Sequence, residues 1–486
     1  MSEHSPEHVD VLVVGAGLSG IGAGYHLQAN CPDRTYAILE GRDTLGGTWD
    51  LFRYPGVRSD SDMHTLGFSF KPWVATKSIA DGPSILAYLH ETVREFGIDR
   101  HIRFGHRVER AEWDSTTNRW TVTARTANGA AVFTCNYLFM CSGYYSYRGG
   151  YTPEFPGRND FAGQIVHPQE WPADLDATGK QVVVIGSGAT AVTIVPAMAD
   201  TAAHVTMLQR TPTYVAAGPD EDRLANALRK VLPSKVAYAI TRRKNTAFQQ
   251  MVYRRTRTKP DKVKKYLLDK VRKELPGYDV DTHFTPPYGP WDQRLCLVPN
   301  GDLFRVIREG KASVVTDRIA TFDETGITLE SGQHLEADII VTATGLQLVT
   351  LGETEFIVDG TKVDFADTLT YKGFAYSDVP NLASVFGYIN ASWTLRADLI
   401  SEYVCRILNH MSTTGAQRCT PTRRGSDADM PLRPWIDDFS PGYMSRDMHR
   451  FPKQGDREPW VNPQDYAKDR AMFAKDPVDD GVMIYR

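Results

Sequence analysis

The stretch Val9-Asp-Val-Leu-Val-Val-Gly15-Ala-Gly17-Leu-Ser-Gly20 decides the fold of this chain. Its short β-branched run predicts a strand buried on both faces of a parallel sheet. Residues 18–29 have helical spacing, and a second strand is expected over residues 36–40. The three glycines suit a tight turn, a close approach of the backbone to a pyrophosphate, and close packing of helix on strand. Such a strand–turn–helix–strand unit is typical of dinucleotide binding.

An acidic residue supports this interpretation. GxGxxG alone is a weak signal, but Glu40 stands about 20 residues beyond the turn, at the end of the second predicted strand. A carboxylate there accepts hydrogen bonds from a ribose diol and repels a 2′-phosphate. The unit therefore suits an ADP-ribose without that phosphate, as in FAD or NAD.

The same order of elements recurs later in the chain. A strand over 181–185 leads into Gly186-Ser-Gly188-Ala-Thr190-Ala191, a helix begins at residue 189, and a strand follows over 205–209. This second strand ends in Arg210-Thr211, whose guanidinium and hydroxyl suit a 2′-phosphate. The contrast between Glu40 and Arg210 predicts FAD at the first unit and NADPH at the second.

These patterns predict an α/β protein with two Rossmann-like dinucleotide-binding domains, for FAD and NADPH, and a helical insertion. The C-terminal part, rich in Pro, Asp and Arg from about residue 420, is expected to be a tail that wraps over the surface. The expected divisions are 1–145 for the first part of the FAD domain, 146–222 with 275–365 for the NADPH domain, 223–274 for the insertion, and 366–486 for the second part of the FAD domain and the tail.

The insertion, residues 223–274, is rich in Lys and Arg. Such a face could contact a membrane surface or an acidic partner. Asp261, Asp269 and Glu274 lie among the basic residues. This mixture of charges favours an ordinary solvated helix face.

Length and composition exclude several classes of protein. The chain has 486 residues and a formal net charge of −4, which gives no reason to expect nucleic acid as a partner. Its polar N-terminus does not resemble a secretory signal, and no apolar run has the roughly 18 residues of a membrane span. We expect a cytoplasmic protein. Its oligomeric state cannot be predicted from the sequence.

Two dinucleotide sites in one chain indicate an electron path from a nicotinamide to a flavin. A disulfide reductase would need a closely spaced redox-active pair of cysteines. No such pair occurs, and no metal site is expected, because the cysteines are scattered: Cys31, Cys135, Cys141, Cys296, Cys405 and Cys419. We therefore expect O2 to accept the electrons.

The segment between the two units carries a family resemblance. Phe161, Gly163, His167, Trp171 and Pro172 match the FxGxxxHxxxWP fingerprint of Baeyer–Villiger monooxygenases, which are class B flavoprotein monooxygenases. Further blocks that resemble this family are Gly46-Gly47-Thr48-Trp49, Arg53 to Asp60, Trp291-Asp-Gln293-Arg294 and Ala343-Thr-Gly345. Ser440-Pro-Gly-Tyr443 and Pro452-Lys-Gln-Gly455 are similar to the ethionamide-activating branch. In the family the fingerprint links the two nucleotide domains, so His167 is not expected to act on the substrate.

The resemblance implies a ketone oxygenation through a flavin C4a-peroxide and names the residues that support it. Arg294 is implied as the permanent counter-charge of the anionic peroxide, because Arg stays protonated throughout the working range. Asp60 is implied as the acid that holds Arg294, with Asp62 as the alternative in the same loop. Many relatives have Lys where this chain has Gln293, so the preference for NADPH would rest on Arg210 and Thr211 and be weaker.

The candidate site residues form two groups. Arg294 and Asp60 are the candidate catalytic residues. For the aromatic residues Phe386, Tyr388 and Trp393 two interpretations stay open: they line the substrate pocket or the flavin, or they belong to the core. The candidate cofactor-binding residues are Gly15, Gly17, Gly20, Glu40, Gly47, Thr48, Trp49, Asp60, Gly186, Gly188, Thr190, Ala191, Arg210, Thr211 and Gln293.

Three functions remain open. The first is Baeyer–Villiger oxidation of a small apolar ketone to an ester or lactone with NADPH and O2. The second is oxidation of sulfur or nitrogen in sulfides, thioamides or amines, which needs a protonated oxidant. The third is a non-catalytic or purely reductive nucleotide-binding protein. The complete set of motifs and the Arg294 block favour the first.

Overall fold

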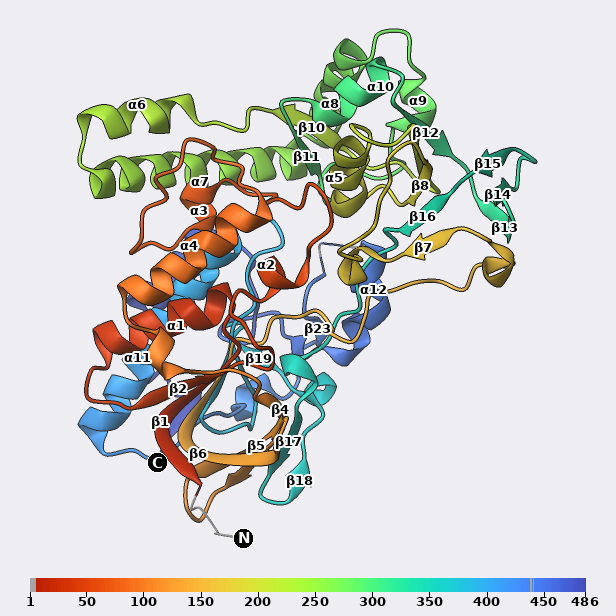
Figure 1. Cartoon of the computed structure of the whole chain (residues 1–486). Helices are drawn as coiled ribbons and strands as arrows, with labels where there is room; N and C mark the ends of the chain where they lie inside the picture. The colour runs from red at the N-terminus through yellow and green to blue at the C-terminus, as the bar shows by residue number, and fades with distance from the viewer. Residues whose placement is uncertain (1–5, 438, 440) are drawn as a thin grey trace.

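The computed structural model describes residues 6–437, 439 and 441–486, so Ser440 of the resembling block lies outside the described residues. Two separate sheets, each containing the strand that leads into one of the glycine turns, form the framework of the molecule (Figure 1). The predicted α/β class is confirmed. The first sheet has nine strands: β1 (Glu7–Val14), β2 (Tyr36–Leu39), β3 (Ile102–Arg103), β4 (Arg107–Asp114), β5 (Arg119–Thr126), β6 (Gly129–Met140), β17 (Glu355–Val358), β18 (Thr361–Lys362) and β21 (Leu382–Ser384).

Strand β1 lies inside this sheet and pairs in parallel with both β2 and β6. Its side chains alternate between two separate cores, as the pleat of a strand requires. Val11 and Val13 pack into the core that the two long helices α1 (Leu18–Asn30) and α11 (Trp393–Thr414) share. Leu12 and Val14 pack on the opposite face, in the core that contains the tryptophans of β4 and β5. A strand covered on both faces explains the continuous apolar run.

The second sheet has five strands, and every pairing in it is parallel. Its order is β12 (Ala312–Thr316), β9 (His204–Gln209), β8 (Gln181–Ile185), β16 (Ile339–Thr342) and β7 (Gln164–Val166). Helices α5 (Ala189–Met198) and α10 (Asp302–Arg308) cover one face of this sheet. The two glycine turns follow β1 and β8, so both lie at the carboxyl ends of parallel strands, where α/β sheets bind ligands.

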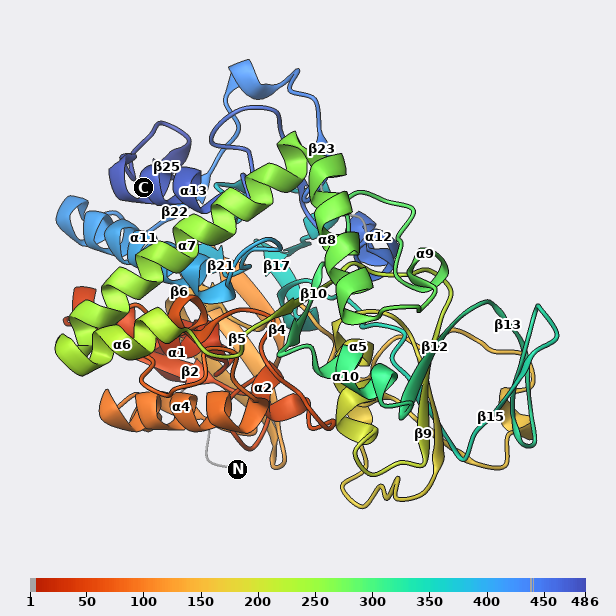
Figure 2. The same ribbon diagram turned by 90° about the horizontal axis from the view of Figure 1, so that it is seen from above.

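Three helices follow the second unit in the chain: α6 (Arg223–Val231), α7 (Ser234–Thr258) and α8 (Pro260–Glu274). Helices α6 and α7 form an antiparallel hairpin that lies across the first sheet's helices rather than over the second sheet (Figure 2). The inner face of α7 is fastened by Arg242, which donates to the backbone carbonyls of His64, Thr65 and Gly67. This segment therefore connects the two halves of the molecule.

The expectation that the C-terminal part only wraps over the surface is wrong. Trp435, Trp460, Phe473 and Val482 are buried, and Trp460 has no exposed surface. Helix α13 (Tyr466–Lys475) packs on α11, and Trp435 belongs to a separate aromatic cluster beside the cavity described below. The prediction failed because the buried aromatics are widely spaced among polar residues, so no periodic pattern marks them.

Candidate active site

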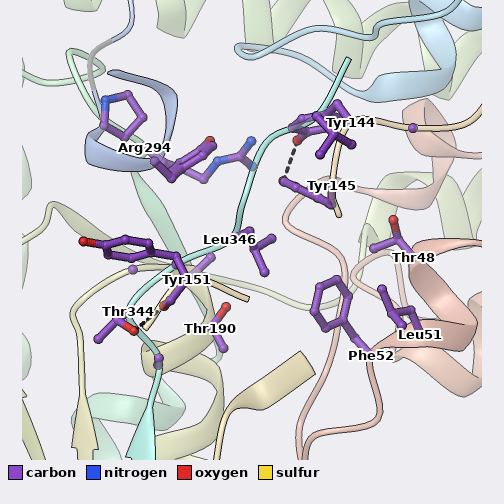
Figure 3. A pocket seen from close by; sticks show the side chains of 18 of the residues that line it. Thr48, Leu51, Phe52, Tyr144, Tyr145, Tyr151, Thr190, Arg294, Thr344 and Leu346 are labelled. Atoms are coloured by element: carbon purple, nitrogen blue, oxygen red, sulfur yellow. Dashed lines mark hydrogen bonds between the residues drawn. The ribbon is translucent and has the colours of Figure 1, made fainter. Parts of the chain in front are cut away.

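A large cavity of about 1180 Å³ lies between the two sheets. Both glycine turns line it, through Gly15, Gly17, Gly186 and Gly188, and so do both candidate catalytic residues. Figure 3 shows Arg294 on one side of this space and Thr48, Leu51 and Phe52 on the other. The fold has therefore brought together segments that lie far apart in the sequence.

The first turn requires glycine for steric reasons. Gly15 has φ +104°, and a Cβ there would lie 2.5 Å from the carbonyl oxygen of Cys141. A Cβ on Gly20 would lie 1.8 Å from the carbonyl oxygen of Gly15. Gly17 lines the cavity, whereas Gly20 does not and instead lets α1 pack against the turn. The N-terminus of α1 consequently faces the cavity, where its free N–H groups suit an anion.

Glu40 follows β2 directly and lines the cavity beside this turn. Its two carboxylate oxygens accept hydrogen bonds from the backbone N–H of Ala16, at 2.8 Å, and of Arg42, at 2.9 Å. Burial raises the pKa of the Glu40 carboxyl, and the two backbone hydrogen bonds oppose that shift. The group is thus held in a fixed orientation at the cavity wall.

The block that contains Gly47, Thr48 and Trp49 lies against the first turn. Gly47 has φ +54° and precedes the short helix α2 (Thr48–Leu51). A Cβ on Gly17 would lie 3.6 Å from the Cα of Gly47, so the two backbones approach closely. All three residues of this block line the cavity.

The second turn resembles the first but is more open. Gly186 has φ +137°, and a Cβ there would lie 2.4 Å from the carbonyl oxygen of Ala343. A Cβ on Gly188 would meet no atom within 4 Å, so a ligand can approach the backbone there. Thr190 lines the cavity, whereas Ala191 is fully buried in the core beneath α5. Ala191 therefore serves helix packing, as expected of the third position of the motif.

The residues predicted to recognise a 2′-phosphate meet at the same part of the cavity. Arg210, Thr211 and Gln293 all line it, and the side chain of Arg210 is exposed. The backbone of Thr211 is fixed by the hydroxyl of Ser187, which donates to its carbonyl oxygen over 2.9 Å. Arg210 thus lies next to the second glycine turn with its guanidinium accessible to a ligand.

Arg294 and Asp60 form an ion pair at the cavity. Nη1 of Arg294 donates to Oδ2 of Asp60 over 2.9 Å, and the two side chains are 34% and 36% exposed. Burial disfavours the charge on Arg294, but the neighbouring Tyr443 and Asp60 outweigh this effect and raise its pKa above the ordinary value. The guanidinium therefore stays charged. The pair uses one N–H of Arg294, so most donors of the guanidinium remain available to the cavity.

The alternative acid, Asp62, has a different role. Its carboxylate accepts from the backbone N–H of Thr65 and from the side-chain amides of Asn245 and Gln249. It caps helix α3 (Met63–Leu66) and binds α7, and it does not line the cavity. Asp60 is thus the acid of this loop that lies beside Arg294.

Sequence reasoning missed a group of tyrosines around Arg294. Tyr144 and Tyr145 line the cavity, and their hydroxyls lie 2.5 Å apart (Figure 3). Tyr443 also lines the cavity, and the positive charge of Arg294 lowers the pKa of its phenol, against the larger effect of burial. Burial is the main cause that raises the pKa of each of these three phenols, so all three stay protonated at neutral pH. The signal for the first two was available, because they follow β6 and the carboxyl end of that strand faces the cavity.

The aromatic residues left open by the sequence divide between two places. Trp393 and Tyr388 line the cavity. Trp393 stacks on Tyr144 with ring centroids 5.1 Å apart, and its indole N–H donates to Ser19. Phe386 instead faces a small neighbouring cavity and packs on Trp435.

His167 of the fingerprint lies between the two halves and away from the cavity lining. Its Nδ1 accepts from the backbone N–H of Gln169 at 3.1 Å, and Nε2 lies 3.3 Å from the carbonyl oxygen of Gly345. Burial lowers the pKa of this imidazole, although the contact with Gly345 opposes the shift. These contacts fasten the linking segment to the strand end that also borders the cavity.

Neither a metal-binding cluster nor a membrane-spanning helix is found in the described part of the chain. Among residues 6–437, 439 and 441–486, no group of three or more His, Cys, Asp or Glu side chains is arranged to hold a metal ion. Within the same ranges, no helix has the length and apolarity needed to cross a membrane.

Comparisons with known proteins agree with this geometry. The model of flavin-binding monooxygenase-like proteins matches residues 78–280, and that of NAD(P)-binding Rossmann-like domains matches residues 13–76. The chain is 53% identical over 476 residues to the FAD-containing monooxygenase EthA of Mycobacterium tuberculosis, covering 98% of this chain and 97% of that protein. It is 50% identical to the putative FAD-containing monooxygenase MymA of the same species, covering 99% and 98%. A solved structure of an oxidized steroid monooxygenase bound to NADP superposes with a TM-score of 0.73 at 26% identity, covering 85% of this chain and 88% of that one.

Proposed function

The chain belongs to the family of FAD-containing monooxygenases, and we propose that it is a Baeyer–Villiger monooxygenase that oxidises small apolar ketones with NADPH and O2. The single observation that carries this proposal is the position of the Arg294–Asp60 pair on the wall of the cavity that both glycine turns line. An oxygenation by an anionic oxidant needs a permanent positive charge at that place.

The residues present fit both cofactors. The first turn, Glu40 and the block Gly47-Thr48-Trp49 would hold FAD, because they surround one end of the cavity with helix N–H groups and a carboxylate for the ribose. The open backbone at Gly188 and the exposed Arg210 would hold NADPH at the other end. Both cofactors together would supply hydride transfer to the flavin and activation of O2.

Arg294 would stabilise negative charge on the oxygen that attacks the ketone. Its guanidinium cannot lose its proton in the working range of pH, because its pKa is raised above an already high ordinary value. Asp60 would act as a positioning residue, because its carboxylate fixes Nη1 and thereby the plane of the guanidinium. Removal of a preorganised donor of this kind costs about 10²–10³ in rate.

The apolar and aromatic parts of the cavity would bind the substrate. Leu51, Phe52, Leu346 and Trp393 line it and carry no charge. Such walls exclude water from the reacting oxygen and favour an apolar ketone over a polar one. We further propose that residues 1–145 and 366–486 form the part that binds FAD, that 146–222 and 275–365 form the part that binds NADPH, and that 223–274 are the helical insertion. Strands β17 and β18 pair in the first sheet, so they belong with the FAD part.

A second candidate function is oxidation of sulfur or nitrogen. It is supported by the hydroxyls of Tyr144, Tyr145 and Tyr443, which stay protonated beside Arg294. Attack on a sulfide requires a protonated oxidant. A phenol that keeps its proton can donate a hydrogen bond to the oxidant's oxygen and so favour the protonated form. The same cavity could therefore serve both reactions, in proportions that depend on the substrate.

One incubation distinguishes the two functions. Purified yellow protein is mixed with NADPH, 2-octanone and thioanisole under ¹⁸O-labelled O2, and products are identified by mass spectrometry. The proposal predicts an ester that contains one labelled oxygen. Labelled sulfoxide without ester would place the second function first, and consumption of NADPH without any labelled organic product would contradict both.

A further inference from the structure

The helical hairpin α6–α7 has an unusual distribution of charge that the proposed function does not use. Residues 223–260 contain eleven Lys and Arg and no Asp or Glu, in a chain whose formal net charge is −4. Asp261, Asp269 and Glu274, the acids that favoured an ordinary solvated helix face, all belong to the following helix, α8. Surface helices normally mix both signs, so this hairpin is a distinct cationic element.

Most of these charges face solvent without a partner. Asp398, Asp222 and Asp292 pair with Arg242, Lys244 and Arg257, respectively. Within the described part of the chain, no ion pair is found for six exposed residues of the two helices: Arg223, Lys230, Lys235, Arg243, Arg254 and Arg255.

The same hairpin also exposes large apolar side chains. Of the eleven large hydrophobic residues that are exposed among the described residues, six belong to it. Phe248 is 60% exposed and Val231 is 76% exposed. The six are Leu224, Val231, Val236, Ile240, Phe248 and Met251. An exposed cluster of this kind on a surface helix indicates a contact surface.

Three of the four exposed apolar residues of α7 lie on the face opposite to the one that packs on the protein, and Phe248 lies on the side of the helix between the two faces. Tyr238, Arg242, Asn245 and Gln249 contact α3 and its preceding loop from the inner face. Val236, Ile240 and Met251 are each two residues away from an inner-face residue, and two residues correspond to about 200° around a helix. In Figure 2, α6 and α7 lie on the side toward the viewer, with no other element drawn across the middle of α7.

From these observations we infer that the outer face of the α6–α7 hairpin binds the surface of an anionic lipid bilayer. A helix with a basic polar face and exposed Phe, Ile and Met lies in the interface, its apolar side chains among the acyl chains and its Lys and Arg at the head groups. This binding would be peripheral and needs no spanning segment. The bilayer is also where an apolar substrate concentrates.

The other occupants of such a face fit the observations less well. A second copy of the chain would bring two hairpins with no acids into contact, and like charges would repel. A nucleic acid would satisfy the Lys and Arg, but its phosphate backbone offers no partner for Phe248, Ile240 or Val236. An anionic bilayer, which is charged at its surface and apolar beneath, satisfies both sets of side chains.

The hairpin is also connected to both loops of the active site. Asn245 and Gln249 bind Asp62, two residues beyond Asp60. Near the end of α7, Arg257 donates to the carbonyl oxygen of Trp291 and to Asp292, close to Arg294. Binding at the outer face would therefore bring a bilayer close to the loops that hold the ion pair.

Co-sedimentation of the full-length flavin-loaded protein with vesicles tests the inference. We expect binding to vesicles of 30% phosphatidylglycerol in phosphatidylcholine at 0.1 M NaCl, at least tenfold weaker binding at 0.5 M NaCl, and no binding to pure phosphatidylcholine. Replacing Arg243, Arg254 and Arg255 together by Gln should weaken binding at least tenfold. Protein that stays in the supernatant with all vesicles would overturn the inference.

A second set of variants tests the apolar contribution. Phe248→Glu combined with Met251→Glu should abolish binding, whereas the matched control Phe104→Glu, at a 40% exposed position outside the hairpin, should leave it unchanged. Flavin absorbance and NADPH consumption in solution verify that each variant is folded. Three results would overturn the inference: unchanged binding of the Glu variant, tighter binding to duplex DNA than to the vesicles, or a dimer that dissociates in the Glu variant.

Discussion

Arg294 donates a hydrogen bond to Asp60 over 2.9 Å, although 234 positions separate the two residues in the chain. The pair lies where the loop after α2 meets the segment before β11 (Cys296–Pro299), at the wall of the cavity. Neither residue is fixed by its own secondary structure, so each depends on the other for its orientation. This mutual dependence makes the pair a sensitive place to test the proposed chemistry.

Replacing Arg294 by Ala should lower the rate of ester formation by about 10² or more while flavin content stays normal. The reason is that the cavity loses its permanent positive charge but keeps the glycine turns. Product analysis and flavin absorbance measure the two quantities. Arg294→Lys retains the positive charge but lacks the planar guanidinium with its several N–H donors, so its rate of ester formation should lie between those of wild type and the Ala variant. An Ala variant with an unchanged ester yield would remove Arg294 from the mechanism.

Substitutions at Asp60 and Asp62 should have different effects, although both acids belong to the same loop. Asp60→Asn should reduce ester formation by about tenfold or more with little change in thermal stability, because the orientation of Arg294 is lost. Asp62→Ala should instead lower the free energy of unfolding by about 1 kcal/mol, because Thr65 loses its helix cap. Thermal unfolding and product rates are measured for both. The assignment fails if Asp62→Ala gives the larger loss of ester at a temperature where both variants are folded.

Arg210 should determine the choice of coenzyme. Replacing it by Gln should lower the ratio of kcat/KM for NADPH over NADH by about tenfold, mainly through KM, because a charge-assisted contact to the 2′-phosphate is lost. Steady-state kinetics with each coenzyme measure the ratio. Gln293→Lys is the complementary variant and should raise it. A wild-type ratio near one would contradict the role proposed for Arg210.

His167 should make stability depend on pH. Burial lowers its pKa below the ordinary value of 6.5, so folding favours the neutral imidazole, whose Nδ1 accepts from Gln169. For a base with a lowered pKa, this stabilisation is fully present above pH 6.5 and is lost as pH falls below that value. The difference in Tm between wild type and His167→Asn should therefore narrow between pH 7.5 and pH 5.5. A difference that stays constant or widens would exclude titration of His167 as the cause.

Local requirements of the backbone made much of this protein predictable from its sequence. Gly15 and Gly186 occupy positive φ, and each has a carbonyl oxygen within 2.5 Å of where a Cβ would be. Only glycine fits there, so the motif reports the turn directly. The apolar run of β1 likewise reports a strand covered on both faces. These features depend on residues that are neighbours in the sequence. For the same reason both dinucleotide-binding units could be predicted from the sequence.

Other features were decided only by the tertiary structure. Tyr144 follows a predicted strand and Tyr443 belongs to a quoted block, but only packing places both side chains beside Arg294. Trp460 is part of the core although its segment, residues 453–465, is rich in charged and polar residues. Helix α7 exposes apolar residues because its polar inner face binds the loop after Asp60. Contacts of this kind join segments hundreds of residues apart, and their energy depends on three-dimensional packing that no local pattern encodes.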